Sequence, residues 1–452
     1  MTPPTPAYSR EQVLALAPDA ASIKACQKLL NPAKWPVRER DPASVWGECR
    51  GSGKEPYRVE VDLAGPAFRC SCPSRKFPCK HALALLLMLA DDAGGFAAAD
   101  PPPRVREWLE SRAERAEKRA TRGERSSARQ ADPERAARRA ATRRAEIEAG
   151  LVDFERWLRD LVRQGLASAQ ERPPSFWTEP ARRLVDAKAP GLASRVHRMS
   201  AVAKRGAEPE KLLALAGEAF LLRTAFARFD ALPAPVQGDV RAALGWPVET
   251  QAVLAGESVR GPMRVLGVSV EERESLRERR FWLRSSKGSR DALLLDFAHG
   301  TRPFENLLVP GTVVDLDLAY YPSAAPLRAV IKERHGEEEA AASAPGGAAD
   351  FAAGLEEIAS YLAANPWLAR LPLALAEALP LYEEGRFQLE DGAGRRLPLH
   401  RSFQHGWSLL AFGGGRPLEI FGEWRGDSFL PLSCWTDGVF QSLSGPLEIA
   451  AA

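Results

Sequence analysis

The chain has 452 residues, of which 45% are apolar and 27% are charged, and this length predicts three or four folded units rather than one core. A formal net charge of +3 gives no reason on its own to expect binding to nucleic acid, so any such prediction must rest on where the charges lie along the chain. Six cysteines are too few for a disulfide framework, and we expect a reducing, cytoplasmic location. The longest apolar run, residues 82–90, is far shorter than the roughly 20 residues that span a bilayer, and residues 1–20 lack the apolar core of a secretory signal.

The first hundred residues contain a strand pattern that leads into a group of cysteines. Apolar and charged residues alternate over residues 57–63, which predicts a half-buried strand, and residues 44–50 are a plausible partner strand. Glycines at positions 51 and 53 fit the hairpin connection between these two strands. Pro78 and the apolar stretch 83–89 predict that the chain turns and then becomes helical. We therefore expect two or three strands followed by a helix.

Four potential metal ligands, Cys70, Cys72, Cys79 and His81, form a C-x-C-x6-C-x-H pattern in this unit. If residues 68–72 are extended, the first two thiols leave the same face, because successive side chains of a strand alternate. Cys79 should lie just before the helix, since two helical residues this close are separated by about 200° around the axis. Three thiolates and one imidazole match a closed, tetrahedral structural site for Zn²⁺, so the pattern predicts one zinc ion per chain.

Two other interpretations of the cluster stay open at this point. The four residues could be grouped by chance, or Cys49 could replace one of them. A catalytic zinc would need an open coordination position and a nearby general base. The sequence contains neither an H-E-x-x-H pattern nor the H-x-E and P-C-x-x-C patterns of zinc deaminases, so it does not support those catalytic classes.

The segments Cys70-Ser71-Cys72 and Cys79-Lys80-His81 resemble the SWIM zinc finger family, whose pattern is C-x-C, a variable spacer and then C-x-H. A glycine-rich hairpin and a Tyr-x-Val strand before them are also similar to the family. The resemblance covers residues 45–89, under a fifth of the chain. It implies a ββα zinc module of the kind found beside helicases, in transposase-like proteins and in many multidomain bacterial proteins. It also implies contacts with DNA or with other proteins, without choosing between them.

Basic residues surround the predicted zinc site and give it a second interpretation. Arg69, Arg75, Lys76 and Lys80 are candidates for contacts with nucleic-acid phosphates. The alternative is structural, because three thiolates and a neutral histidine leave Zn²⁺ with a formal charge of −1 that nearby cations would offset.

An arginine-rich arm follows the three prolines at positions 101–103. Residues 104–150 contain 14 lysines and arginines against 9 aspartates and glutamates, so the whole positive surplus of the chain lies here. Apolar residues are few before Ile147, which predicts a solvated helix or a partly disordered arm, interrupted near Pro133. Such a segment is a soluble spacer or an electrostatic contact for nucleic acid.

The remaining sequence predicts three further units and a linker. Apolar spacing indicates a helical domain over residues 151–250, with helices at 181–188, 207–229 and 235–244. Residues 256–335 read as a small β-rich domain with strands at 263–270, 280–285, 292–297 and 313–320. Residues 336–350 have the composition of a flexible linker. The last unit, residues 351–452, has helical candidates at 351–364 and 373–379 and strand candidates at 387–389, 407–412, 418–424 and 429–432.

The predicted fold class is therefore an α+β multidomain protein. It would comprise an N-terminal ββα zinc finger module within residues 1–100, an Arg-rich helical arm over residues 101–150, the helical and β-rich domains, the linker and a C-terminal α+β domain. The leading interpretation of the tryptophans at positions 407, 424 and 435 in the last domain is that they form part of its core. The alternative is an exposed aromatic face that binds a partner.

No motif for phosphate-loop, dinucleotide or serine-hydrolase chemistry is present in the sequence. We expect a non-catalytic, zinc-binding adaptor that engages a protein partner, and the resemblance implies an ATPase-associated assembly as one such partner. The first alternative is a nucleic-acid-binding protein that uses the finger and the arm. The second is an enzyme of unrecognised class in the C-terminal half.

Overall fold

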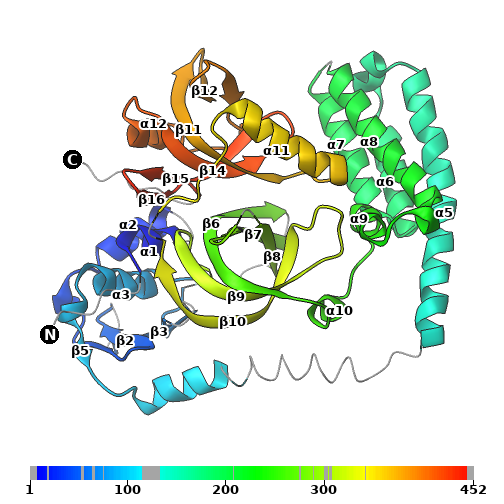
Figure 1. Ribbon diagram of the computed structural model, residues 1–452. Helices are drawn as coiled ribbons and strands as arrows, with labels where there is room; N and C mark the ends of the chain where they lie inside the picture. Colours follow the sequence, from blue (N-terminus) through cyan, green and yellow to red (C-terminus); the bar gives the residue numbers. More distant parts are fainter. Residues whose placement is uncertain are drawn as a thin grey trace.

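A computed structural model of the chain describes residues 8–17, 20–51, 55–63, 67–74, 76–112, 114, 133–206, 208–273, 276–288, 290–299, 304, 308–341 and 343–444. Figure 1 shows four packed parts. The N-terminal unit lies beside a central β-barrel, the C-terminal sheet covers another side of that barrel, and a helical bundle lies at the end of the molecule away from the N-terminal unit. Among the described residues, no helix is long and apolar enough to cross a bilayer.

The N-terminal unit is an antiparallel sheet covered by helices. Helices α1 (Arg10–Ala15) and α2 (Ala20–Gln27) precede strands β1 (Val37–Arg40), β2 (Ser44–Cys49), β3 (Tyr57–Asp62) and β4 (Ala67–Cys70), helix α3 (Lys80–Asp91) and strand β5 (Ala97–Ala98). The sheet order is β4-β3-β2-β1-β5, with only the β1–β5 pair parallel. The two strands and the helix predicted around the cysteines are confirmed, whereas α1, α2, β1 and β5 were not predicted.

Helix α3 packs directly on this sheet and forms the centre of the unit's core. Its apolar residues from Ala82 to Leu89 are all buried, because α1 and α2 cover the side that the sheet does not. Close approach needs Gly47 in β2, where a Cβ atom would lie 2.7 Å from the Val37 carbonyl oxygen and 3.0 Å from the Leu85 side chain. The finger helix is thus fixed on a sheet larger than a ββα module.

The bundle consists of long helices that mostly start at prolines. Helices α5 (Pro133–Arg163), α6 (Pro174–Asp186), α7 (Pro190–Lys204), α8 (Pro209–Ala227) and α9 (Ala234–Leu244) share one core, and α10 (Thr250–Leu254) leads to the barrel. Proline fits the first helical turn because its missing N–H would be unpaired there in any case. Helix α5 runs without interruption through residue 150, so the predicted boundary between arm and helical domain is not an element boundary. The sequence marks only where apolar spacing begins on this continuous helix.

Five strands form a closed barrel in the order β10-β8-β7-β6-β9. They are β6 (Val259–Arg273), β7 (Leu276–Ser285), β8 (Asp291–His299), β9 (Thr312–Tyr320) and β10 (Arg328–Ala340), and only β8 and β10 pair in parallel. Alternate residues of β7 face opposite ways: Phe281 and Leu283 fill the barrel, while Trp282 packs against the C-terminal unit. The four predicted strands of the β-rich domain are confirmed.

The C-terminal unit is a six-stranded antiparallel sheet with helix α11 (Phe351–Ala364) on one face. The sheet order is β13-β12-β11-β14-β15-β16. The strands are β11 (Leu371–Glu383), β12 (Arg386–Glu390), β13 (Arg396–Pro398), β14 (Leu418–Trp424), β15 (Phe429–Thr436) and β16 (Val439–Ser442), and a short helix α12 (Gly406–Gly413) precedes β14.

Three predictions for this region were wrong. Residues 373–379 form strand β11 and not a helix, because the strand is central and its Leu and Ala residues are buried on both faces. Residues 407–412 form helix α12 and not a strand. Residues 336–340 continue β10, and Ala348 exchanges backbone hydrogen bonds with β11 at 2.9 Å, so the predicted linker is bound to the sheet.

The bundle is fixed to the barrel by a buried carboxylate. Asp239 in α9 is 3% exposed and accepts hydrogen bonds from Ser323 Oγ at 2.5 Å, the Ala324 amide at 2.9 Å and Asn365 Nδ2 at 2.7 Å. The first two partners lie in the loop between β9 and β10, and Asn365 lies at the end of α11. Because one side chain joins three parts, the bundle has a defined position on the rest of the molecule.

The N-terminal unit is also joined to the barrel. Val309, which precedes β9, is fully buried in the core of the N-terminal unit. Gln12 Nε2 in α1 donates a hydrogen bond of 3.2 Å to the Gly311 carbonyl oxygen. The finger is thus part of a continuous scaffold.

Candidate metal centre

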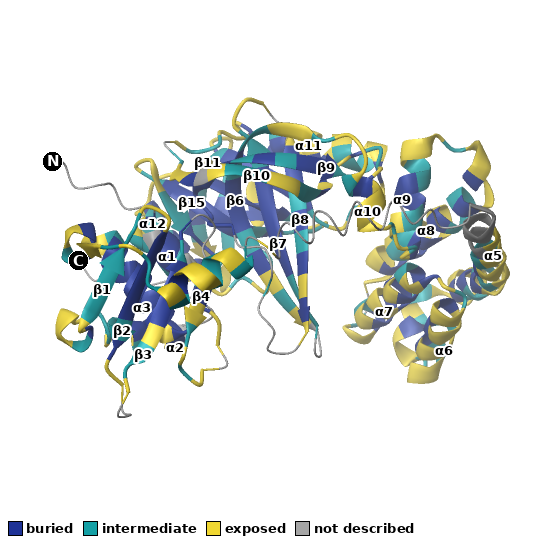
Figure 2. Ribbon diagram, turned by 90° about the horizontal axis from the view of Figure 1, so that it is seen from below, coloured by how far each residue is buried: buried dark blue, intermediate teal, exposed yellow. Residues whose placement is uncertain are grey.

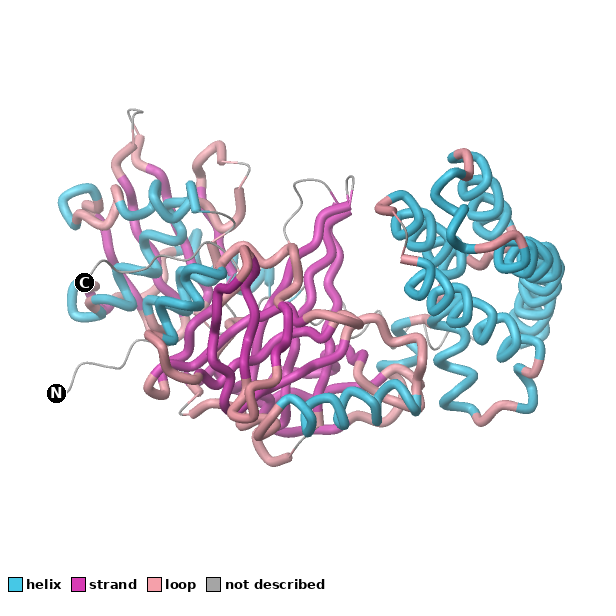
Figure 3. Tube along the Cα trace, turned by 90° about the horizontal axis from the view of Figure 1, so that it is seen from above, coloured by secondary structure: helices cyan, strands magenta, loops and turns pink. Residues whose placement is uncertain are grey.

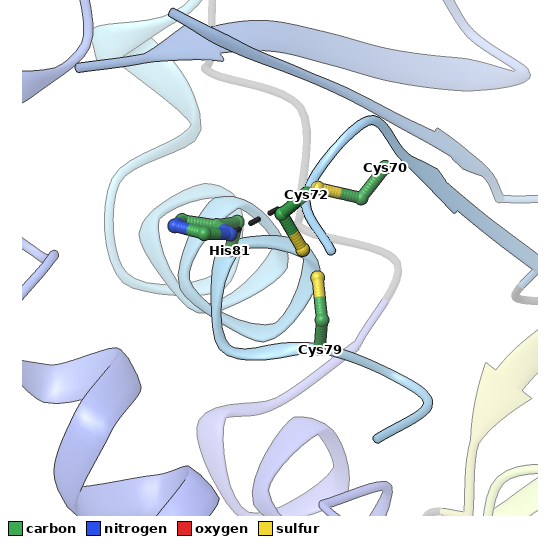
Figure 4. Close-up of side chains that lie close together, drawn as sticks. All are labelled: Cys70, Cys72, Cys79 and His81. Atoms are coloured by element: carbon green, nitrogen blue, oxygen red, sulfur yellow. Dashed lines mark hydrogen bonds between the residues drawn. The ribbon is translucent and has the colours of Figure 1, made fainter. Parts of the chain in front are cut away.

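The four predicted ligands come from two elements that meet at one corner of the N-terminal unit. Cys70 is the last residue of β4, and Cys72 follows it by two residues. Cys79 is the N-cap of α3 with an extended backbone (φ −79°, ψ 165°), and His81 lies in the first turn of that helix. Figure 4 shows the three sulfurs and the imidazole pointing toward one another. The predicted placement of Cys79 just before the helix is confirmed.

The distances between the ligand atoms fit a single tetrahedral ion. One atom from each of the four residues lies within 4.8 Å of all the others, and Cys70 Sγ lies 3.9 Å from His81 Nδ1. Zinc bonds of about 2.3 Å to sulfur and 2.0 Å to nitrogen require ligand atoms about 3.5 to 3.8 Å apart in a tetrahedron. The residues present therefore fit Zn²⁺ and fill all four of its positions.

The electrostatics of the cluster favour thiolate at Cys79. A hydrogen bond from the Cys70 thiol lowers the pKa of Cys79 to about 4, although burial opposes this shift. The same bond and burial raise the pKa of Cys70, and burial raises the pKa of Cys72. Cys79 and His81 are 5% and 4% exposed, so a charge at this position is held away from bulk water. A divalent ion is the counter-charge that such a set of sulfurs binds.

Neighbouring aromatic rings hold the ligands in place. The Tyr57 ring packs on the His81 imidazole with centroids 4.7 Å apart, and Phe68 meets Phe77 edge to face at 5.9 Å. The Tyr-x-Val strand was predicted as a strand and as a feature similar to the family, and the structure places its tyrosine against the His81 ring. Cys49 is fully buried and does not belong to the group of four, so it replaces none of the ligands.

Two segments of the chain match known families. Residues 57–90 match the SWIM zinc finger, and residues 142–244 match the SWIM-associated four-helix bundle domain. The chain thus contains a SWIM zinc finger and a SWIM-associated helical bundle. The second match falls on α5 to α9, which the sequence analysis described only as helical. Known proteins give no closer guide, because no curated protein and no solved structure matches the chain.

The basic residues beside the SWIM finger have different environments. Arg69 in β4 forms an ion pair with Glu60 at 2.5 Å, donates to the Arg104 carbonyl oxygen at 3.1 Å and lies over the Trp108 ring. Its charge is therefore used within the protein. The signal for this role was the acidic Glu60 opposite Arg69 in the hairpin register.

Two of the other three predicted phosphate contacts lie in the described part of the chain. Lys76 and Lys80 are exposed, and Lys80 begins α3 directly beside the site. Arg75 lies outside the described residues. The structure thus places Lys80 next to the zinc ligands. The charge of Arg69 is instead paired within the protein.

A second group of potential ligands lies on the barrel and differs from the SWIM finger in kind. Asp317, Glu333 and His335 place their ligand atoms within 4.8 Å of one another on β9 and β10. Glu333 is exposed, and its carboxylate lies 3.9 Å from His335 Nε2. Two carboxylates and one imidazole supply only three ligands, so this set is open. Among the described residues, the closed set of three sulfurs and one nitrogen in the finger is therefore the candidate metal centre.

Proposed function

We propose that this protein is a non-catalytic adaptor in which zinc folds the N-terminal unit and an exposed aromatic surface binds a protein partner. The observation that carries the proposal is a cluster of three aromatic rings on the C-terminal unit. We call Tyr382, Phe387 and Trp407 the aromatic cluster.

The aromatic cluster is exposed and preorganised. Trp407 in α12 is 63% exposed and Tyr382 in β11 is 43% exposed. Ring centroids lie 4.7 Å apart for Tyr382 and Phe387, 4.8 Å for Tyr382 and Trp407, and 5.2 Å for Phe387 and Trp407. A Cβ atom at Gly406 would lie 2.5 Å from the Phe387 ring, so the glycine lets α12 set Trp407 against the sheet. Exposed tryptophan and tyrosine of this kind are typical anchors of protein interfaces.

The zinc centre supports a structural role in this proposal. Three sulfurs and one nitrogen occupy every position of a tetrahedral ion, which leaves none for a substrate or an activated water. The four zinc ligands hold α3 against the end of β4. The core of the N-terminal unit also includes Val309, which belongs to the barrel part of the chain. Zinc would therefore stabilise the surface that the N-terminal unit shares with the rest of the scaffold.

Two contacts favour a protein partner over nucleic acid. Arg69 already pairs with Glu60, as described above. The barrel face of β7 and β8 lies under the C-terminal sheet, where Trp282 and Leu293 are packed. By analogy, five-stranded OB barrels bind oligonucleotides on the face of their second and third strands, and here Trp282 and Leu293 occupy part of that face with contacts to the C-terminal unit. An ATPase-associated assembly in a reducing cytoplasm is the partner that we would test first.

Truncating the aromatic cluster is expected to abolish partner capture. Trp407→Ala combined with Tyr382→Ala in the tagged full-length protein should lower recovery of its partner from nuclease-treated lysate by at least about tenfold, as expected for loss of two interface anchors. Phe297→Ala is the matched control, because Phe297 is an aromatic residue of the barrel with 45% exposure. Mass spectrometry of the captured material, with zinc content as a check on folding, gives the result.

Equal recovery by the double variant and the wild type would contradict the proposal. A partner that disappears on nuclease treatment would favour nucleic acid instead. In that case a mobility-shift assay at two salt concentrations should show affinity that falls steeply with salt and falls further in Lys76→Ala and Lys80→Ala.

A further inference from the structure

Helix α8 carries apolar residues on two opposite faces. One face packs into the bundle through buried residues, which are Leu212, Ala216, Ala219, Leu222 and Phe226. The opposite face is open to solvent and also apolar. Leu213 is 52% exposed, Leu221 is 46% exposed and Phe220 is 37% exposed. With Ala214 and Gly217 between them, these residues form a stripe along the helix, which we call the α8 stripe.

We propose that the α8 stripe is a homodimer interface, in which two copies of α8 pack antiparallel with Gly217 on the two-fold axis. This inference is independent of the adaptor role proposed above. The spacing of the stripe is symmetric about Gly217: Leu213 and Leu221 lie four residues on either side, and Ala214 and Phe220 lie three residues on either side. An antiparallel pair therefore places each leucine against the other leucine of the partner helix. It also places each Phe220 beside the Leu213 of the second copy, and each Ala214 beside its Leu221.

These are the features that a self-complementary contact requires. In a two-fold interface the same patch meets itself, so residues at equal distances before and after the axis must fit one another. A large side chain meets a small one where Leu221 of one copy lies beside Ala214 of the other, which lets the two surfaces interdigitate. A Cβ atom added at Gly217 would have no neighbouring atom within 4 Å, so the helix backbone is open to close approach at the axis.

The charges at the ends of the stripe have the matching arrangement. Glu210 lies near the start of α8 and Arg228 immediately follows its end, and both are exposed. At 100° per residue, these two side chains share the direction of the stripe, because 18 residues make five full turns. In the part of the chain that the structure describes, neither has an ion-pair partner within its own chain. Antiparallel packing brings each Glu210 near the Arg228 of the second copy, with about 6 Å between them along the axis.

The stripe faces away from the rest of the molecule. Lys211 in the same helix forms an ion pair of 2.9 Å with Asp427 of the C-terminal unit, so that side of α8 is directed inward. Leu213 and Gly217 lie more than 100° around the helix from Lys211. The bundle forms one end of the molecule in two perpendicular views (Figures 1 and 2), and Figure 3 shows the same end from above. A second copy can therefore approach this end.

A charged side chain contacts the edge of the stripe. The guanidinium of Arg159 in α5 lies 5.7 Å from the centre of the Phe220 ring. The Arg159 side chain leaves Leu213, Gly217 and Leu221 uncovered. The exposure of Leu213 and Leu221 shows this for the two leucines. The free helix face is thus continuous across the proposed axis.

A cysteine at the axis tests the geometry directly. Gly217→Cys in the full-length protein should form a disulfide-linked dimer under mild oxidation, because the two thiols face each other across the axis. Ala227→Cys is the matched control, since this exposed residue of the same helix would lie about 30 Å from its copy. Wild-type protein gives the background from its native cysteines.

Mass measurement in solution supplies the second readout. Wild-type protein should be a dimer at tens of micromolar, and Leu221→Glu should be a monomer. Glu210→Arg alone or Arg228→Glu alone should weaken the dimer. The double variant, in which the two end charges are exchanged, should restore it. Equal crosslinking of Gly217→Cys and Ala227→Cys, or a wild-type monomer at this concentration, would overturn the proposal. So would a dimer that Leu221→Glu leaves intact.

Discussion

Replacing Cys72 with serine is expected to remove the zinc ion and to unfold the N-terminal unit. The four ligands fit one tetrahedral ion, and each thiolate supplies one of its four bonds. Structural zinc binding contributes about 10–16 kcal/mol in small zinc-dependent domains, which is as large as the whole stability of a typical domain of about 5–15 kcal/mol. Metal analysis should fall from one zinc per chain to near zero, and hydrogen exchange should lose protection in β2, β3 and α3.

Cys49→Ala is the matched control for this change. Cys49 is a buried thiol of the same core and is not one of the four ligands. Its truncation should cost about 1–2 kcal/mol through lost packing and should leave zinc bound. Full zinc occupancy in Cys72→Ser, or equal loss in both variants, would show that the ligand assignment is wrong.

The second large effect is expected at Glu423, which joins the C-terminal sheet to the barrel. Its side chain is fully buried, and its Oε1 accepts hydrogen bonds from Arg280 Nε at 3.2 Å and Trp282 Nε1 at 3.0 Å. Oε2 accepts from Arg425 Nε at 3.0 Å. Glu423→Ala should lower the free energy of unfolding by about 3 kcal/mol, because Arg280 Nε and Trp282 Nε1 would lose a buried acceptor, while Arg280 keeps its ion pairs with Glu271 and Glu278. Urea denaturation followed by tryptophan fluorescence measures the change.

An exposed ion pair of the same unit provides the control. Arg396 pairs with Glu383 at 2.5 Å, but their side chains are 44% and 46% exposed. Glu383→Ala should therefore change the free energy of unfolding by less than about 1 kcal/mol. If the two variants had similar stability, Glu423 would not join the two units in the way described.

The same network should make stability fall in acid. Burial alone would raise the pKa of Glu271, but the charges of Arg370, Arg280 and Arg425 lower it from an ordinary value of 4.5 to about 2. A carboxylate whose pKa is lower in the folded state stabilises the fold fully above its unfolded pKa and loses that effect as pH falls. The contribution of Glu271 should thus be complete above about pH 5 and lost between pH 4.5 and 2. Wild type and Glu271→Gln should converge in stability over this interval.

Local patterns were sufficient to predict the metal centre. The alternation in β3, the C-x-C and C-x-H spacing and the start of α3 after Cys79 all depend on residues within about thirty positions of one another, although β4 ends at Cys70 and does not extend to Cys72 as predicted. Ligand spacing and strand geometry are short-range properties, so one sequence contains them. Four of the five barrel strands, β6 to β9, were also predicted from local sequence, and β9 shows the period-2 alternation of burial most clearly.

Long-range packing explains the errors. Strand β11 contains leucine and alanine on both faces, and only its position between β12 and β14 makes that pattern a strand and not a helix. Helix α12 is eight residues long and is set by Gly406 against Phe387, a contact that composition does not reveal. The predicted linker after residue 335 is polar, yet it continues β10 because β9 offers it a partner edge.

Interfaces between the units were beyond sequence reasoning altogether. Glu423 and Arg280 are 143 residues apart, and Asp239 meets Asn365 across 126 residues. Nothing near any of these residues in the sequence marks it as buried. Glu423, Arg280 and Asp239 were not singled out from the sequence, and the structure places them at the contacts that hold its parts together.

Zinc X-ray absorption spectroscopy on the purified full-length protein tests the central claim most directly. The account predicts one zinc ion with three sulfur neighbours at about 2.3 Å and one imidazole nitrogen at about 2.0 Å, and no bound water. A shell with two sulfurs and added oxygen or nitrogen ligands would contradict it, because the site would then be open and the zinc would not be the closed structural centre of the N-terminal unit.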